Sequence, residues 1–334
     1  MALSFSASSY PLYVANNVNK HEKKPSVIRS PPSSSFALRS CSPPIKADHS
    51  INNSSEPQRI CSQENTVGII GGVSVLSTLI FLEKFVLWSS REERENIPFI
   101  VCSDPMVVKD AYKSSIAMSS ASHELVSDSN DEEISAGLDR VRLVENLREK
   151  RMFLEGGGAR CIVMPCHLSH AWYGEISQGC EQPFLHVAEC VVKELKEARF
   201  RPLEVGSCVK VGVLASDATL VAGVYQEKLQ DQGFEVVLPD KSTMENIINP
   251  AMISLKQKDM KGARNLLRIA IQVLLVKAVN TVIIASHDLQ CLLPHDDPLV
   301  KKCIDPMDAL ARSAVRWAKS AKLHKRNLNS IPNY

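Results

Sequence analysis

The feature that most constrains the fold is an internal repeat. A short apolar run, a turn of small residues and an apolar pattern at helical spacing occur at 67–85 and again at 211–229, with a constant offset of 144 residues. Such a pattern predicts a buried strand, a tight turn and a helix. A short apolar run of this kind is typical of a strand in a parallel sheet. The repeat therefore predicts two related α/β halves.

The elements that follow each copy extend the repeat. Third strands are expected at 161–167 and 281–287, which are offset by 120 residues. Strands that alternate with helices predict a parallel sheet in each half. We therefore expect two Rossmann-like halves, at 65–204 and 205–320, related by a pseudo-two-fold axis with a cleft between them and followed by a tail at 321–334. The remaining expected elements are second strands at 97–104 and 234–240, helices at 140–154 and 261–278, fourth strands at 183–187 and near 303–304, and helices at 188–198 and 306–319.

One insertion distinguishes the first half from the second. Residues 113–137 are rich in Ser, Asp and Glu and show little apolar periodicity. This composition predicts a surface loop in the first half. A lid over the cleft is the alternative, since binding residues often lie on loops.

The first fifty residues differ from the rest of the chain. They contain 12 Ser, 6 Pro, six basic and two acidic residues, and they have no long apolar run. A basic, Ser-rich and acid-poor opening predicts an organelle transit peptide at 1–50, here for the chloroplast stroma, followed by a linker at 51–64. A tail without an import signal is the alternative.

The composition argues against several classes of protein. The net charge is only +2, whereas a dedicated nucleic-acid binder carries a basic excess or patch. The apolar segment at 67–82 has 16 residues, fewer than the roughly 20 of a membrane span, and includes three glycines. None of the ten cysteines forms a Cys-x-x-Cys pair, so we expect neither a metal nor a cofactor site built on one.

The candidate binding residues come from the predicted strand ends. Ligands of open parallel sheets bind outside the carboxyl ends of the strands, so these turns should face one cleft. Glycine turns leave backbone N–H groups free to hold an anion, and hydroxyls there either bind the ligand or cap a helix. The predicted contacts to a small amino acid or dicarboxylate are Gly72, Ser74, Thr78, His167, His170, Ser216, Thr219, His287 and Asp288.

Cys166 is the candidate reactive thiol. It lies where the third strand of the first half meets a predicted helix start. A helix N-terminus stabilises an anion, so we expect a lowered pKa for this thiol. The alternative is a buried and inert cysteine. The neighbouring His167 and His170 and the position at the cleft favour a reactive thiol.

Five separated motifs carry a resemblance to a known family. The motifs at 66–78 (TVGIIGGVSVLST), 162–173 (IVMPCHLSHAWY), 183–187, 211–229 and 304–317 keep their order and span about residues 65–320. In these motifs the chain resembles the aspartate/glutamate racemase family. Together with the expected transit peptide, this resemblance suggests a plant plastid-type member of the family. The resemblance implies racemisation without pyridoxal phosphate by two opposed cysteines, one at the end of the third strand in each half. It places the first of these on Cys166.

The second cysteine of the family is missing. Where the family reads Gly-Cys-Thr-Glu, this chain has Ala285-Ser286-His287-Asp288, and the Asn-Thr after the first cysteine is replaced by His167-Leu168. Ser286, the residue that takes the position of the second acid/base, carries a hydroxyl, which is a far poorer base than a thiol at neutral pH.

Three hypotheses for the function remain open. The first is cofactor-independent racemisation of aspartate or glutamate, with Cys166 and Ser286 as the catalytic pair. The second is a one-thiol isomerase or decarboxylase of small dicarboxylates, and the third is an amino-acid-binding relative without catalysis. The predicted partner is a small amino acid or dicarboxylate rather than a nucleic acid or a membrane, and both a homodimer and a monomer are compatible with the sequence.

Overall fold

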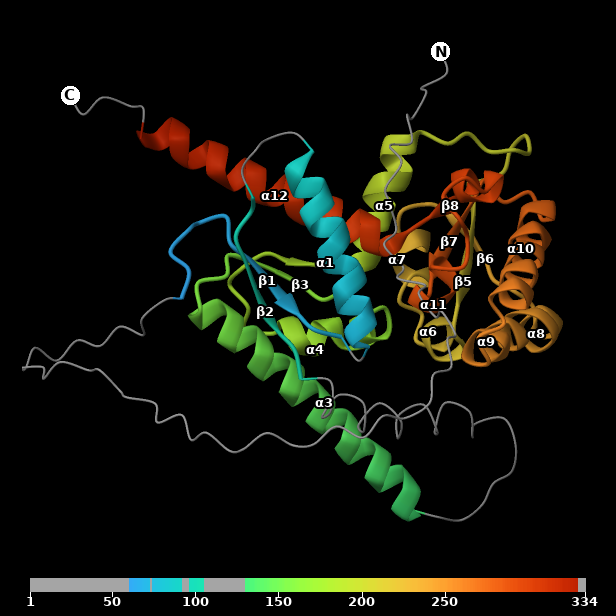
Figure 1. The fold of residues 1–334 in the computed structure, drawn as a ribbon, viewed down its shortest axis with the longest axis horizontal. Coiled ribbons are helices and arrows are strands. Elements are labelled where there is room, and N and C mark those ends of the chain that lie inside the picture. Colours follow the sequence, from blue (N-terminus) through green and yellow to red (C-terminus); the bar gives the residue numbers. More distant parts are fainter. Residues whose placement is uncertain (1–59, 73, 92–95, 105–129, 330–334) are drawn as a thin grey trace, which may run out of the picture. The chain divides into compact units, whose positions relative to one another are not determined.

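The computed structural model describes residues 60–72, 74–91, 96–104 and 130–329. The expected transit peptide at 1–50, most of the linker and residues 113–129 of the expected loop lie outside the described residues. Within the described part, two four-stranded parallel sheets form the framework (Figure 1), as the repeat predicts.

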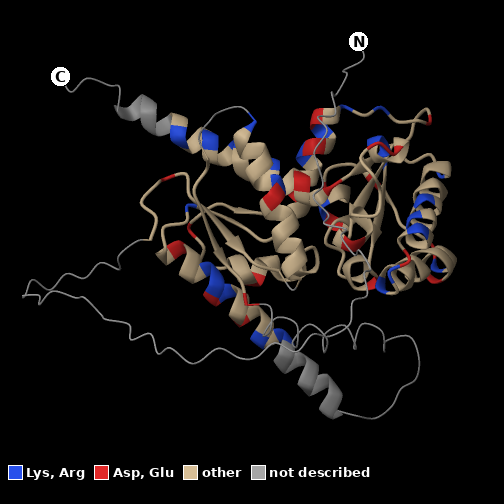
Figure 2. Cartoon of the chain, viewed as in Figure 1, with Lys and Arg blue, Asp and Glu red and all other residues tan. Residues whose placement is uncertain are grey.

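The first sheet has the strand order β2-β1-β3-β4. It consists of β2 (Phe99–Cys102), β1 (Val67–Ile70), β3 (Cys161–Val163) and β4 (Phe184–Leu185). Its strands carry no charged residue and appear tan in Figure 2. Strands β1 and β3 are fully buried, which explains their continuous apolar sequences.

The second sheet repeats this arrangement in the order β6-β5-β7-β8. It consists of β6 (Glu235–Val237), β5 (Lys210–Ala215), β7 (Thr281–Ala285) and β8 (Cys303–Ile304). In both halves the first strand in sequence pairs with the second and the third, so the two sheets share one connectivity. The predicted duplication of the fold is confirmed.

The helices cover the sheets and connect their strands. Helix α3 begins ten residues before the expected residue 140, so residues 130–137 of the expected loop are helical. Acidic residues are favoured in the first turn of a helix, so the Asp-Glu-Glu sequence at 131–133 suits a helix start as well as a loop. The α-helices are α1 (Val75–Ser90), α3 (Asn130–Gly156), α4 (Tyr173–Ser177), α5 (Val187–Ala198), α6 (Asp217–Val221), α7 (Gln226–Gln230), α8 (Lys241–Thr243), α9 (Asn249–Lys256), α10 (Met260–Val276), α11 (His287–Gln290) and α12 (Pro306–Asn329).

Three short helical turns of other types also occur among the described residues. A 3₁₀ turn spans Leu168–Trp172, a π-helical turn spans Met244–Ile248 and a second 3₁₀ turn spans Pro298–Lys302. At the other end of the second half, α12 continues to Asn329, so the segment expected as a tail from residue 321 is helical up to that point.

Helix α12 links the two halves. It follows the last strand of the second half but packs against α1 and α5 of the first half (Figure 1). Trp88 Nε1 on α1 donates a 2.6 Å hydrogen bond to Asp308 Oδ1, and Arg316 on α12 forms a 2.8 Å ion pair with Glu194 on α5. One hydrophobic cluster accordingly contains residues of both sheets together with α12, so the halves share a core.

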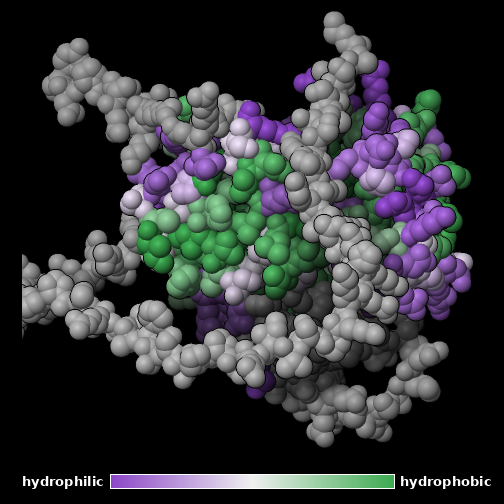
Figure 3. Space-filling model, in the orientation of Figure 1, coloured by the Kyte–Doolittle hydropathy of each residue, from purple (hydrophilic) through white to green (hydrophobic). Residues whose placement is uncertain are grey.

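Helix α1 is apolar on its exposed face as well as on its buried one. Phe81 and Phe85 point into the core and are almost fully buried. This double apolarity explains why the sequence at 67–82 resembles a membrane span, although it forms β1, a glycine turn and the start of α1. No helix among the described residues is both long and apolar enough to cross a bilayer. Figure 3 shows a hydrophobic area, in green, on this face of the molecule in the region of the first sheet and α1. The exposed apolar side chains of these elements are Val75, Leu76, Leu79 and Val86 of α1 and Phe99 and Val101 of β2.

Candidate active site

Cys166 lies just beyond the carboxyl end of β3. It is 8% exposed, and the Ser169 hydroxyl donates a 2.9 Å hydrogen bond to its sulfur. The residues after it form the 3₁₀ turn Leu168–Trp172 rather than an α-helix. The helix start expected after Cys166 is therefore a 3₁₀ turn, which continues directly into α4.

Ser286 occupies the corresponding place after β7. It is the N-cap residue of α11, and its Oγ accepts a hydrogen bond from the Leu289 backbone N–H at 3.5 Å. Short polar side chains are favoured at this position because they pair with an otherwise free helix N–H group. The structure therefore gives Ser286 a local structural role.

The two histidines that follow these residues meet at the junction of the halves. The rings of His167 and His287 lie 4.6 Å apart between centroids, at an interplanar angle of 41°. Their offset is 120 residues, the same offset that relates Cys166 to Ser286. We call His167 and His287 the histidine pair. Their contact confirms that the carboxyl ends of β3 and β7 face each other.

Tyr225 holds one member of the histidine pair in place. Its Oη lies 2.6 Å from His167 Nδ1, and both side chains are buried. Burial, with a smaller effect of Asp305, raises the pKa of the Tyr225 phenol well above its usual value, so the phenol stays protonated. The phenol and His167 Nδ1 therefore share one hydrogen bond, in which the tautomer of His167 sets the donor.

Both members of the histidine pair are neutral at physiological pH. Burial lowers the pKa of His167 well below 6.5, and the neighbouring His287 and His170 lower it further. Burial also lowers the pKa of His287 to about 4, with a contribution from the positive charge of Lys84. A neutral imidazole has one nitrogen that accepts a proton and one that donates a hydrogen bond.

Three ring nitrogens of the histidine pair have no hydrogen-bond partner. They are His167 Nε2, His287 Nδ1 and His287 Nε2, each buried and unpaired among the residues that the structure describes. Buried polar atoms in folded proteins are nearly always paired, and exceptions tend to mark bound water, ligands or catalytic groups. These nitrogens are therefore available to a ligand at the junction.

An ion pair between the halves lies near the histidine pair. Lys84 Nζ on α1 is 2.6 Å from Asp305 Oδ2, just before α12. Burial raises the pKa of the Asp305 carboxyl, and the attraction of Lys84 offsets only part of this increase. The charge of Lys84 reaches His287, which shows that this ion pair contributes to the electrostatics of the junction.

The glycine turn after β1 lies against Cys166. A side chain at Gly72 would place its Cβ only 3.0 Å from Cys166 Cβ, so only glycine fits without a shift. The Gly72 N–H is already bonded to Thr78 Oγ1, at 3.2 Å, and Ser74 is exposed. The turn therefore shapes the wall beside Cys166, while its expected anion-binding N–H group is occupied.

His170, another predicted contact, lies close enough to His167 to lower its pKa. His170 binds the Met164 carbonyl at 3.0 Å through Nε2 and packs against His186 and Tyr173 inside the first half. Its ring therefore packs against aromatic neighbours of its own half, and its contact with a ligand stays a prediction.

The hydroxyls after β5 bond to each other. Ser216 Oγ and Thr219 Oγ1 lie 3.1 Å apart, and Thr219 is buried. Asp288 is exposed on α11. No described contact joins these three residues to the histidine pair, although Ser216 and Asp288 do follow strand ends, as predicted.

Tyr225, Lys84 and Asp305 were not among the site residues predicted from the sequence. One signal for Tyr225 was available: it occupies the position that Phe81 takes in the first copy, 144 residues earlier, so a hydroxyl appears where the repeat has none. Lys84 and Asp305 are more than 200 residues apart, and their contact follows only from the packing of α12 on α1.

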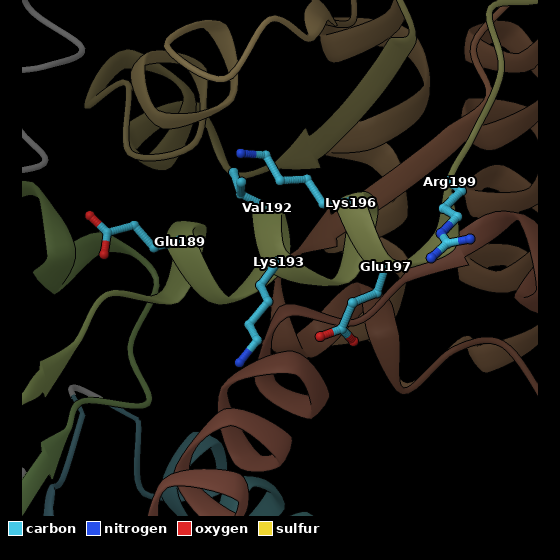
Figure 4. Close-up of a pocket in the computed structure, with 6 residues that line it drawn as sticks. All are labelled: Glu189, Val192, Lys193, Lys196, Glu197 and Arg199. Atoms are coloured by element: carbon cyan, nitrogen blue, oxygen red, sulfur yellow. The ribbon is translucent and has the colours of Figure 1, made fainter.

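A groove on the surface of α5 is a poor alternative site. Figure 4 shows Lys193 and Lys196 pointing in different directions along the helix rather than converging. None of the predicted site residues lines this groove. Its lining residues are Glu189, Val192, Lys193, Lys196, Glu197 and Arg199. In the described ranges no group of three or more His, Cys, Asp or Glu side chains has a metal-binding arrangement.

Comparison with known families identifies the chain's relatives. The family described as Asp/Glu/Hydantoin racemase matches residues 70–314, which include both halves and the histidine pair. The chain belongs to this racemase family. The match ends within α12, so it includes the first part of the helix that joins the halves.

The racemase family includes relatives of known activity and structure. A broad specificity amino-acid racemase of Bacillus subtilis is 27% identical over 178 residues, which cover 53% of this chain and 73% of that protein. The fold matches the aspartate racemase of Picrophilus torridus with a TM-score of 0.55 and 22% identity, over 78% of this chain and 98% of that one. An aspartate racemase homologue of Pyrococcus horikoshii has a TM-score of 0.59 and 19% identity, over 76% and 99% of the two chains.

Proposed function

We propose that the protein is an amino-acid racemase that uses no pyridoxal phosphate and acts on a small acidic amino acid, aspartate or glutamate. The observation that carries this proposal is the contact of His167 with His287. Because Cys166 and Ser286 directly precede these two residues, the ends of β3 and β7 approach one site from opposite sides. Racemisation needs this arrangement, since the Cα proton leaves from one face and another arrives at the opposite face.

Cys166 acts as the acid/base on the first face. A thiol can donate a proton, and its thiolate form can remove one. Ser169 holds the sulfur by a 2.9 Å hydrogen bond, and the glycine turn at Gly72 packs against Cys166 Cβ. These contacts keep the sulfur at the end of β3.

Racemase activity is tested by incubating the protein with L- and D-aspartate and glutamate in D₂O, followed by chiral analysis and mass spectrometry. We expect deuterium at Cα of both enantiomers. Cys166→Ala should lower racemisation about 10²- to 10⁴-fold, the usual contribution of a general acid/base. Cys161→Ala is the matched control, because Cys161 is a buried thiol at the opposite end of the same strand.

One observation favours the alternatives. The Ser286 hydroxyl caps α11, so the second face lacks both the thiol and a free hydroxyl. A one-thiol isomerase or decarboxylase of small dicarboxylates, or a binding protein without catalysis, would need no second acid/base. Calorimetric binding of an acidic amino acid without any deuterium exchange at Cα would decide for the binding protein.

We also propose import into the chloroplast stroma. The support is the composition of residues 1–50, which are basic and rich in Ser and Pro. A fluorescent fusion of residues 1–60 should enter plastids in leaf cells, and a fusion that stays in the cytosol would refute import. A homodimer stays a prediction, which sedimentation of the purified protein would check.

A further inference from the structure

We propose that His287, rather than Ser286, is the second acid/base, on the face of the substrate opposite Cys166. This inference rests on the proposed racemase function and names the group that replaces the family's second thiol. His287 lies in the second half, directly after the position of that thiol, and its ring meets His167 at the junction.

The contacts of His287 leave it free for proton transfer. Both of its ring nitrogens are buried and have no hydrogen-bond partner among the described residues. Leaving a buried polar atom unpaired is destabilising, so two such atoms on one ring are unusual unless a ligand or water completes them. A bound amino acid at the junction would supply this missing partner.

The two neighbours of His287 are less suited to this task. Ser286 accepts the Leu289 N–H, and an alcohol is a weak base without a helper. His167 already uses Nδ1 in its bond to Tyr225 and directly follows Cys166, so it belongs to the same side as the first acid/base. Of these three residues, only His287 combines unpaired ring nitrogens with a place in the second half.

The proton balance is complete with a thiol and an imidazole. In one direction, neutral His287 removes the Cα proton and becomes an imidazolium, while the Cys166 thiol gives its proton to the other face and becomes a thiolate. In the reverse direction, the thiolate removes the proton and the imidazolium returns one. The total number of protons on the two residues is the same in both states, and no cofactor is consumed. The lowered pKa of His287, about 4, means that the resting state holds a neutral imidazole.

The test follows deuterium exchange at Cα separately for each enantiomer in D₂O. Loss of one acid/base should abolish exchange of one enantiomer only. We expect His287→Gln to lower the exchange of one enantiomer about 10²- to 10⁴-fold while the other remains within tenfold, and Cys166→Ala to show the opposite selectivity. His295→Gln, which changes an exposed histidine, is the control.

The ratio of the two enantiomers separates chemistry from folding. Partial unfolding lowers the exchange of both enantiomers equally, so a one-sided loss cannot arise from it. The smaller His287→Asn variant is measured alongside, with the melting temperature of each protein. Ser286→Ala should still exchange both enantiomers.

Two results would overturn the inference alone. One is a His287→Gln protein that still exchanges both enantiomers, and the other is a one-sided loss in Ser286→Ala that is absent in His287→Gln. A wild-type protein that exchanges neither enantiomer of any acidic amino acid would instead overturn the proposed function, and the inference with it.

Discussion

Mild acid should destabilise the protein because the fold buries neutral histidines. His167, His170 and His186 are each at most 5% exposed, and the nitrogens of His287 are buried at the junction. Burial lowers the pKa of all four, with that of His186 and of His287 falling to about 4. The unfolded chain restores a pKa near 6.5, so it binds more protons than the folded chain between these two values.

The sign and size of the effect follow from this difference in proton binding. The stability that each histidine contributes is complete above pH 6.5 and is lost as the pH falls towards 4. For a pKa of about 4 in the folded state and about 6.5 in the unfolded state, such a histidine lowers the free energy of unfolding by about 1 kcal/mol between pH 7.5 and pH 5.5. His186 and His287 together therefore cost roughly 2–3 kcal/mol, and His167 and His170 act in the same direction.

Urea denaturation at pH 7.5, 6.5 and 5.5, followed by circular dichroism, measures this loss. The raised pKa values of Glu194 and Asp305 act in the opposite direction, so the informative quantity is the difference between the wild type and His287→Gln. We expect that variant to lose about 1 kcal/mol less than the wild type over the same range. A free energy of unfolding that stays constant or rises towards pH 5.5, with no difference for His287→Gln, would refute the reasoning.

Three further predictions concern contacts that hold the fold together. Tyr225→Phe should lower the free energy of unfolding by about 1–3 kcal/mol, since it leaves the buried His167 Nδ1 unpaired, and an unchanged urea midpoint would contradict this. Trp88→Phe removes the 2.6 Å bond to Asp308 between the halves and should cost about 1 kcal/mol in a thermal melt, whereas a stabilised variant would speak against this bond. Gly68→Ala would place its Cβ 2.8 Å from two side-chain carbons and should cost about 1–3 kcal/mol by calorimetry; no loss would mean that the core relaxes around it.

The sequence by itself determined the strands, their duplication and the residues at their ends. A buried parallel strand needs a continuous apolar run, and a tight turn needs small residues, so both are visible in a local pattern such as 67–72. The constant offsets of 144 and 120 residues then related β1 to β5 and β3 to β7. The limits of α3 and α12 were less visible, because helix ends rich in charged residues lack apolar periodicity.

Only the tertiary structure decided which side chains at the strand ends meet. His167 and His287 are separated by 120 residues, and their contact depends on how the two halves pack. From the sequence, Tyr225 was predicted only as one apolar position of a helix. The fold shows that its hydroxyl contacts His167. His170, which shares a motif with Cys166, turned instead towards His186 and Tyr173. A sequence pattern indicates which residues of an element are buried. The partner of a buried polar atom, in contrast, depends on long-range packing. In this protein the packing places His287 at the junction with both of its ring nitrogens unpaired among the described residues.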